Sequence, residues 1–273
     1  VASSIVVSAG AVLDLNGSSL ASPLLSGAGL VTNSAASAVA ILVGGTSATD
    51  VTTTGNVSMG IALADNYPAN NASKLGVTKA GLGTLTFTNT TNINYGDILV
   101  VAGKVTGSAA NTFSPNANVL LGNVTTAALT ATLDTGAFNQ TIGGLQALNT
   151  NATGLASVLI GAGKTLTVKG NVTLGLDAGV ASTSNLTATG GAMNVTSGSI
   201  TVSVNQAATN AAYYSAASLD VTGLSSFTTN VTNFNIGVGS TTTGQGVVLL
   251  SNTANTIAAT TLQVGNSGAN NGN

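Results

Sequence analysis

Several residue types are scarce or missing in this chain, and each absence excludes a class of protein. The 273 residues contain no cysteine, histidine or tryptophan and only 3 prolines; the charged residues, 4% of the chain, are all lysine or aspartate. Without cysteine there are no disulfides and no thiolate metal sites. Because phosphate binding depends on clustered Lys and Arg, five scattered lysines argue against nucleic acid and anionic membrane surfaces as partners.

Long hydrophobic runs are also absent. The longest apolar run, Ala38 to Val43, has six residues, whereas a transmembrane helix needs about 20. We therefore predict no membrane insertion in this segment. Disorder is a poor fit as well, since disordered chains are charged and poor in apolar residues, and this chain is 44% hydrophobic.

The residues that are abundant favour strands over helices. Glycine, threonine, asparagine and valine are mediocre or poor helix formers, and Gly or Asn pairs mark turns between short β-branched segments. Thr84 to Thr88 alternates threonine with leucine and phenylalanine, the period of a strand with one buried face. We predict an all-β chain whose strands include residues 3–7, 84–88, 98–101, 164–168, 199–204 and 247–250.

Internal repetition indicates how these strands are arranged. Residues 11–17 reappear at 131–136, and 54–60, 83–87 and 119–122 match 169–175, 198–202 and 234–237 at an offset of 115 residues. Repeated units stack on one another. The sequence predicts one β-solenoid over residues 1–273 with a repeat of about 115–120 residues, roughly 11–122 and 131–237 with a third partial copy at 247–273, and roughly 20 to 25 residues per coil. Accidental matches from the biased composition are the alternative.

A β-sandwich with hairpins is the competing architecture. A sandwich core normally contains large aromatic side chains, and aromatics make up 3% of this chain. Small polar side chains stack well in parallel ladders, which favours the solenoid. The segments Asn66 to Ser73 and Ser108 to Asn118 are predicted to project from the stack as loops, and Ala207 to Ala217 is a third candidate.

Some motifs point to a family. Lys79 to Phe87, continuing from Tyr95 to Val105, together with Leu133 to Leu145 and Gly161 to Val168, resembles the repeats of bacterial autotransporter passenger domains, of the class found in large surface antigens. The resemblance implies a right-handed parallel β-helix displayed outside the cell or on its surface.

Catalytic chemistry has few candidate groups. Carboxylate pairs hydrolyse glycosides, but the chain has no histidine, arginine or glutamate to act as a base or to stabilise developing charge. Asp14 and Asp134 occupy matching positions, which favours a turn-forming role. Asp14 to Gly17 is a faint cluster of oxygen ligands that fits a turn equally well. We predict no enzyme activity, no catalytic or metal site and no cofactor.

Asparagine and threonine patterns leave two further alternatives open. Asn56, Asn123, Asn171, Asn194 and Asn230 each begin an Asn-Val-Ser/Thr sequon and are candidates for N-glycosylation, or else ladder-forming polar residues. Thr-x-Thr pairs such as Thr84 and Thr86 would suit an ice-binding face, but any surface strand of period two in a threonine-rich chain produces them.

The combined expectation is a non-catalytic extracellular structural protein, the unit of a fibre, sheath or surface layer. Exposed strand edges are normally protected by charge and proline, and both are scarce here. Open ends could therefore pair with further copies into a homopolymer. The alternative is an autotransporter-type surface adhesin that binds a cell-surface or glycan ligand through its loops.

Overall fold

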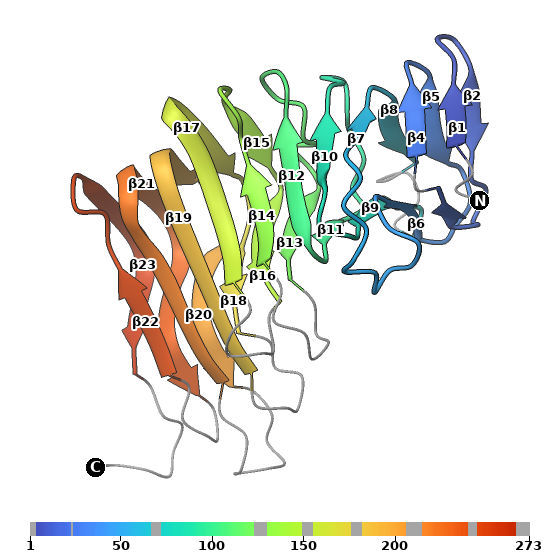
Figure 1. Cartoon of the computed structure of the whole chain (residues 1–273). Helices are drawn as coiled ribbons and strands as arrows, with labels where there is room; N and C mark the ends of the chain where they lie inside the picture. The colour runs from blue at the N-terminus through green and yellow to red at the C-terminus, as the bar shows by residue number, and fades with distance from the viewer. Residues whose placement is uncertain are drawn as a thin grey trace.

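The regular secondary structure of the described residues consists of parallel β-strands. A computed structural model describes residues 4–22, 24–66, 72–122, 130–148, 155–175, 182–205, 215–239 and 245–265. These residues contain strands β1 to β23 and no helix that could cross a membrane. Every strand pairing is parallel. The strands succeed one another along an elongated molecule from β1 and β2 to β22 and β23 (Figure 1).

The chain passes through three rows of strands in a fixed order, and one passage through all three is called a turn. The first row contains β1 (Ser4–Val7), β4 (Leu24–Gly27), β7 (Val57–Met59), β10 (Thr84–Phe87), β12 (Gly103–Gly107), β14 (Thr130–Asp134), the first parts of β17 (Leu155–Val168), β19 (Ser182–Val195) and β21 (Ser215–Gly239), and β22 (Gln245–Leu249). The second row contains β2 (Val12–Asp14), β5 (Leu30–Asn33), β8 (Ala62–Asp65), β15 (Gln140–Ile142), later parts of β17, β19 and β21, and the start of β23 (Asn255–Val264).

The third row completes each turn. It contains β3 (Leu20–Ala21), β6 (Val39–Val43), β9 (Leu75–Lys79), β11 (Ile98–Val100), β13 (Asn118–Leu121), β16 (Gly144–Ala147), β18 (Val172–Leu174), β20 (Ser199–Asn205) and the ends of β21 and β23. The 18-stranded sheet, flanked by sheets of two and three strands, is compatible with a β-solenoid.

Turn length varies more than the sequence predicts. Val12 pairs with Leu30, 18 residues later, whereas Ile200 pairs with Phe234, 34 residues later. Turns early and late exceed the expected 20 to 25 residues, as where Ile41 pairs with Val77, 36 residues later. In these turns more residues separate a third-row strand from the next first-row strand. Nine residues, for example, lie between the end of β20 and the start of β21.

The core consists of stacked side chains of similar size. In the third row Ile41, Val77, Ile98, Val119, Leu145, Val172, Ile200 and Phe234 occupy successive paired positions, each at most 2% exposed. Neighbouring residues of each strand point outward, so the period-two pattern separates a dry interior from a polar surface. Thin layers of Val, Ile and Leu therefore replace the bulky aromatic core of a globular domain.

Two of the segments that recur after 115 residues, 54–60 and 83–87, lie against each other in adjacent turns, and so do their counterparts 169–175 and 198–202. Val57 pairs with Leu85, and the matching Val172 pairs with Ile200. In the first contact the Asn56 Oδ1 atom accepts the Thr84 N–H at 2.8 Å. In the second, the Oδ1 atom of Asn171 accepts the N–H of Ser199 at 2.9 Å. The same corner is thus built in the first row in one copy and in the third row in the other.

Of the other matched segments, some lie in the same row as their counterparts and some do not. Val119 and Phe234 lie on one ladder of the third row, and Thr141 and Thr256 lie on one ladder of the second, four pairings apart in each case. Residues 11–17, however, contain β2 in the second row, and residues 131–136 overlap β14 in the first. For the ladders of Val119 and Thr141 the offset of 115 residues is the length of four turns. The boundaries of the long repeat stay a prediction.

The expectation of a projecting loop at Ser108 to Asn118 is wrong for its centre. Thr112, Phe113 and Ser114 are at most 1% exposed, and the Phe113 ring meets the Phe87 ring edge-to-face at 5.5 Å. The segment lacks strand hydrogen bonding but is held in the second row, where the Oε1 atom of Gln140 accepts the N–H of Thr112. Residues 67–71 and 207–214 of the other two predicted loops lie outside the described residues.

Candidate functional site

A cluster of hydrogen-bonded polar groups joins the loop that follows β6 to the end of β9. Lys79, the last residue of β9, is fully buried. Its Nζ atom donates to the carbonyl oxygens of Ala80 at 2.6 Å, Gly81 at 2.7 Å and, in the next turn, Ala102 at 3.4 Å. The ammonium therefore ties two successive turns together from inside.

Asp50 completes this cluster. Its two carboxylate oxygens accept both the backbone N–H and the side-chain hydroxyl of Thr46, Thr52 and Thr53. The Thr53 hydroxyl, followed by the N–H groups of Thr46 and Thr52, holds the pKa of Asp50 far below its usual range. The backbone carbonyl of Asp50 also accepts the Gly81 N–H at 2.7 Å, which fastens the loop to the Lys79 corner.

The two charged groups of the cluster stabilise the backbone around them. Burial lowers the pKa of Lys79 to about 8, and the charge of Asp50 opposes this shift. The lysine protons point at carbonyl oxygens and the Asp50 oxygens are occupied by six donors. Neither group is aimed at open space where a substrate could react.

Asp14 and Asp134, which match in the sequence, stabilise tight bends of the backbone, as predicted. Asp14 Oδ1 accepts the N–H groups of Asn16 and Ser34, and Asp134 Oδ1 accepts the Gly136 N–H. The Ser34 hydroxyl, with the Asn16 N–H, lowers the pKa of Asp14. Asp220 makes the same contact with the N–H of Thr222. Since Asp14 lies in the second row and Asp134 in the first, the two carboxylates are not brought together by stacking.

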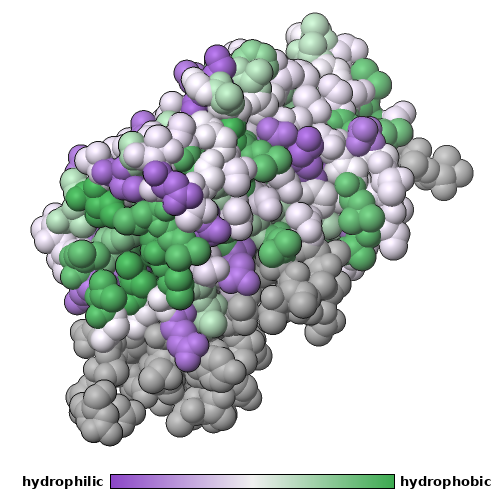
Figure 2. All heavy atoms as spheres, turned by 60° about the vertical axis from the view of Figure 1, so that its left-hand side comes forward, coloured by the Kyte–Doolittle hydropathy of each residue, from purple (hydrophilic) through white to green (hydrophobic). Residues whose placement is uncertain are grey.

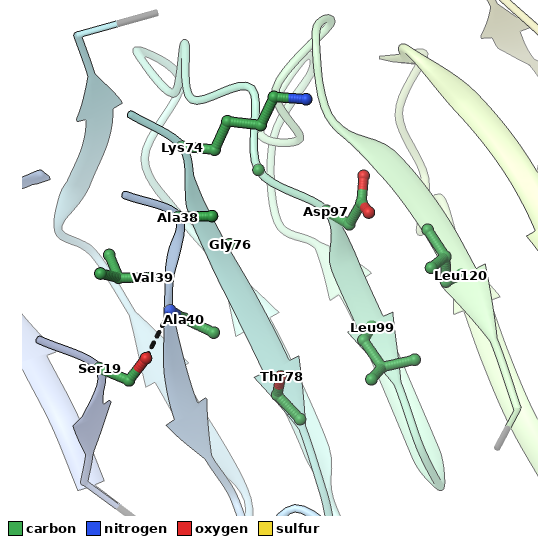
Figure 3. A pocket seen from close by; sticks show the side chains of 11 residues that line it. Ser19, Ala38, Val39, Ala40, Lys74, Gly76, Thr78, Asp97, Leu99 and Leu120 are labelled. Carbon is green, nitrogen blue, oxygen red and sulfur yellow. Dashed lines mark hydrogen bonds between the residues drawn. The ribbon is translucent and has the colours of Figure 1, made fainter. Parts of the chain in front are cut away.

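An open groove of about 370 Å³ crosses the outer face of the third row in the early turns. Small residues such as Ala40 and Gly76 form its floor, and Leu99 and Leu120 stand beyond them (Figure 3). Of the described residues that line it, Lys74 and Asp97 are charged and none is aromatic. The groove has the form of a shallow hollow where side chains are short.

The sequons have different surroundings. Asn56, Asn171 and Asn230 are exposed, Asn194 is half-buried, and Asn123 lies outside the described residues. The Oδ1 atoms of Asn56 and Asn171 each receive the N–H of a strand in the next turn, which is the behaviour of ladder-forming residues. N-glycosylation at the five positions stays a prediction.

Sequence reasoning missed the role of Lys79, which was treated as one of five scattered lysines. The available signal was its position directly before Ala80-Gly81 and the next strand, a corner where several carbonyl groups converge. Comparison of the chain with protein-family models, with curated proteins and with solved structures gives no match.

Proposed function

We propose that this chain is a non-catalytic structural β-solenoid, right-handed and extracellular, whose copies stack end to end. Parallel pairing in three rows supports the solenoid, and crossover connections between parallel strands are right-handed in about 98% of cases. The resemblance to passenger-domain repeats supports a location at the cell surface. The observation that carries the assembly proposal lies at the β22–β23 end.

Among the described residues of that end, side chains that face the core are exposed. Ile257, Leu262 and Val264 are paired with Thr229, Phe234 and Ile236 of the preceding turn. Phe234 is 2% exposed, whereas Leu262 and Val264 are 60% and 67% exposed. Figure 2 brings this end forward and shows a broad hydrophobic area on it. The apolar column of the core thus continues to a surface that another turn would cover.

The strand edges at this end favour the same partner. Residues 245–264 include no charged residue and no proline, so the edge lacks the features that normally prevent strand addition. At the opposite end the inward-facing side chains of Ile5 in β1 and Leu13 in β2 are only partly buried. A second copy placed with β1 to β3 on β22 and β23 would add backbone hydrogen bonds to apolar burial, and such a heterologous contact propagates without closing.

The test uses paired charge substitutions. Ile257→Lys with Leu262→Lys should keep the full chain monomeric, because two ammonium groups would have to be buried in the junction. Leu82→Lys is the matched control, since Leu82 is 51% exposed in an early turn. Sedimentation velocity over a range of concentrations and negative-stain microscopy should show filaments for the wild type and the control alone.

A wild-type chain that stays monomeric at every concentration would contradict the proposal, as would filaments of undiminished length in the doubly substituted chain. Circular dichroism checks that the variant retains its strands. The adhesin function stays a prediction, and deleting residues 67–71 should abolish ligand binding without affecting assembly if it is correct.

A further inference from the structure

Two buried oxygen atoms without a hydrogen-bond partner belong to the same corner of the fold. They are Asp65 Oδ1, at the end of β8 in the second row, and Asn94 Oδ1, in the following turn. Among the described residues only one other buried side-chain atom, Asn235 Oδ1, shares this property. Asn94 is 1% exposed, so bulk water does not satisfy its oxygen.

Hydrogen bonds place the two side chains around one residue, Leu75. The Asp65 Oδ2 atom accepts the Leu75 N–H at 2.9 Å, and the Asn94 Nδ2 atom donates to the Leu75 carbonyl at 2.8 Å. Asp65 Oδ2 also accepts the N–H of Tyr95, the residue directly after Asn94, at 2.8 Å. The carboxylate and the amide are therefore held by the N–H and the carbonyl of one residue, Leu75, and each has one oxygen left over.

Comparison with Asp50 shows what the corner lacks. The Asp50 carboxylate receives six donors, whereas Asp65 receives two, both on Oδ2. Neither donor is a cationic side chain, and the carboxylate is half-buried with Oδ1 fully enclosed, although a charge withdrawn from water is normally paired or coordinated to a metal. The second orphaned oxygen, on Asn94, is likewise an acceptor and cannot compensate the carboxylate.

We propose that this corner binds a hard cation of the calcium type through Asp65 Oδ1 and Asn94 Oδ1. Carboxylate and amide oxygens are the ligands such ions take, with water completing the coordination. An ion satisfies both oxygens and neutralises the carboxylate, whereas a bridging water would satisfy the oxygens and leave the charge. The site would fasten β8 to the corner of the next turn, and it does not depend on assembly of the chain.

Terbium luminescence tests the site, because Tb³⁺ replaces Ca²⁺ and is sensitised by a nearby tyrosine. Tyr95 adjoins Asn94, and the chain has no tryptophan to contribute background. The wild-type chain should show tyrosine-sensitised Tb³⁺ emission that added Ca²⁺ displaces. Asp65→Asn, which keeps the shape and removes the charge, should weaken Tb³⁺ binding by about tenfold or more.

Asp97→Asn is the matched control, because Asp97 lies at the same corner and its Oδ1 atom accepts a hydrogen bond from the Asn118 side chain. This variant should bind Tb³⁺ as the wild type does. As a second readout, Ca²⁺ should raise the melting temperature of the wild type and of Asp97→Asn but not that of Asp65→Asn. Absence of both effects in the wild type, or their survival in Asp65→Asn, overturns the proposal and leaves water as the occupant.

Discussion

Replacing Lys79 with methionine tests whether one buried ammonium holds successive turns together. Methionine preserves most of the aliphatic volume but removes the donor shared by the carbonyls of Ala80, Gly81 and Ala102. A buried acceptor left without a partner costs about 1 to 3 kcal/mol. Part of this loss is offset because the variant no longer buries a charge, so we expect a net destabilisation of about 2 kcal/mol at pH 7.

The pH dependence of stability distinguishes this mechanism from a simple packing defect. The pKa of Lys79 is about 8 in the folded chain, below the ordinary lysine value of 10.5. Between these values the unfolded chain binds more protons than the folded one, so the free energy of unfolding rises with pH. From pH 7 to pH 9.5 the increase is about 2 kcal/mol. Lys79→Met lacks this increase, and the difference between the two proteins should widen to about 4 kcal/mol at pH 9.5.

Guanidinium unfolding followed by circular dichroism at pH 7 and pH 9.5 measures both quantities. Lys169→Met is the matched control, because Lys169 is exposed; it should change stability by less than about 0.5 kcal/mol and keep the pH-dependent increase. Equal pH slopes for the wild type and Lys79→Met would refute the assignment of the lowered pKa to Lys79.

The two remaining predictions concern packing. A Cβ atom on Gly83 would lie 2.1 Å from the Gly55 carbonyl oxygen, whereas one on Gly55 would meet nothing within 4 Å. In thermal melts Gly83→Ala should therefore lower the free energy of unfolding by about 2 to 3 kcal/mol, and Gly55→Ala by less than about 1 kcal/mol. Phe113→Ala removes a fully buried ring and should lower the free energy of unfolding, measured with denaturant, by about 3 to 5 kcal/mol. Ile93→Ala is the control and should lower it less, because the Ile93 side chain is 56% exposed. Equal losses for the two variants would mean that the second-row position of Phe113 is wrong.

Strand positions were largely predictable, because they depend on local alternation. Residues 84–88 and 98–101 contain β10 and β11, and residues 247–250 overlap β22. The turn-forming role of Asp14 also followed from the sequence, since an aspartate accepts the N–H two residues later whatever the surrounding fold. These features need no knowledge of which segments lie side by side.

Row membership was not predictable for a physical reason. Every row has the same pattern of inward aliphatic and outward polar residues, so Gly55-Asn56-Val57 and Gly170-Asn171-Val172 look alike although they lie in different rows. Phe113 was placed in a projecting loop because Pro115 lies in a stretch rich in Asn, Ala and Ser. Its burial depends on Phe87 in the preceding turn. The Lys79 site was missed because a lysine is normally solvated, and only the converging carbonyls of two turns reverse that preference.

The stacking of turns also explains why the chain contains so few charges. Paired residues of adjacent parallel strands lie about 4.8 Å apart, so a charge repeated in successive turns would face its own kind, which is destabilising. Neutral side chains avoid this repulsion, as in the outward ladder Thr141, Thr167, Asn194, Thr228 and Thr256. Two of the charged side chains have specific partners: Lys104 meets Asp134 of the next turn at 3.1 Å, and Lys79 is surrounded by carbonyls. The low charge content is therefore a consequence of parallel, in-register winding, and it leaves strand edges at the β22–β23 end without the repulsion that would prevent another turn from adding.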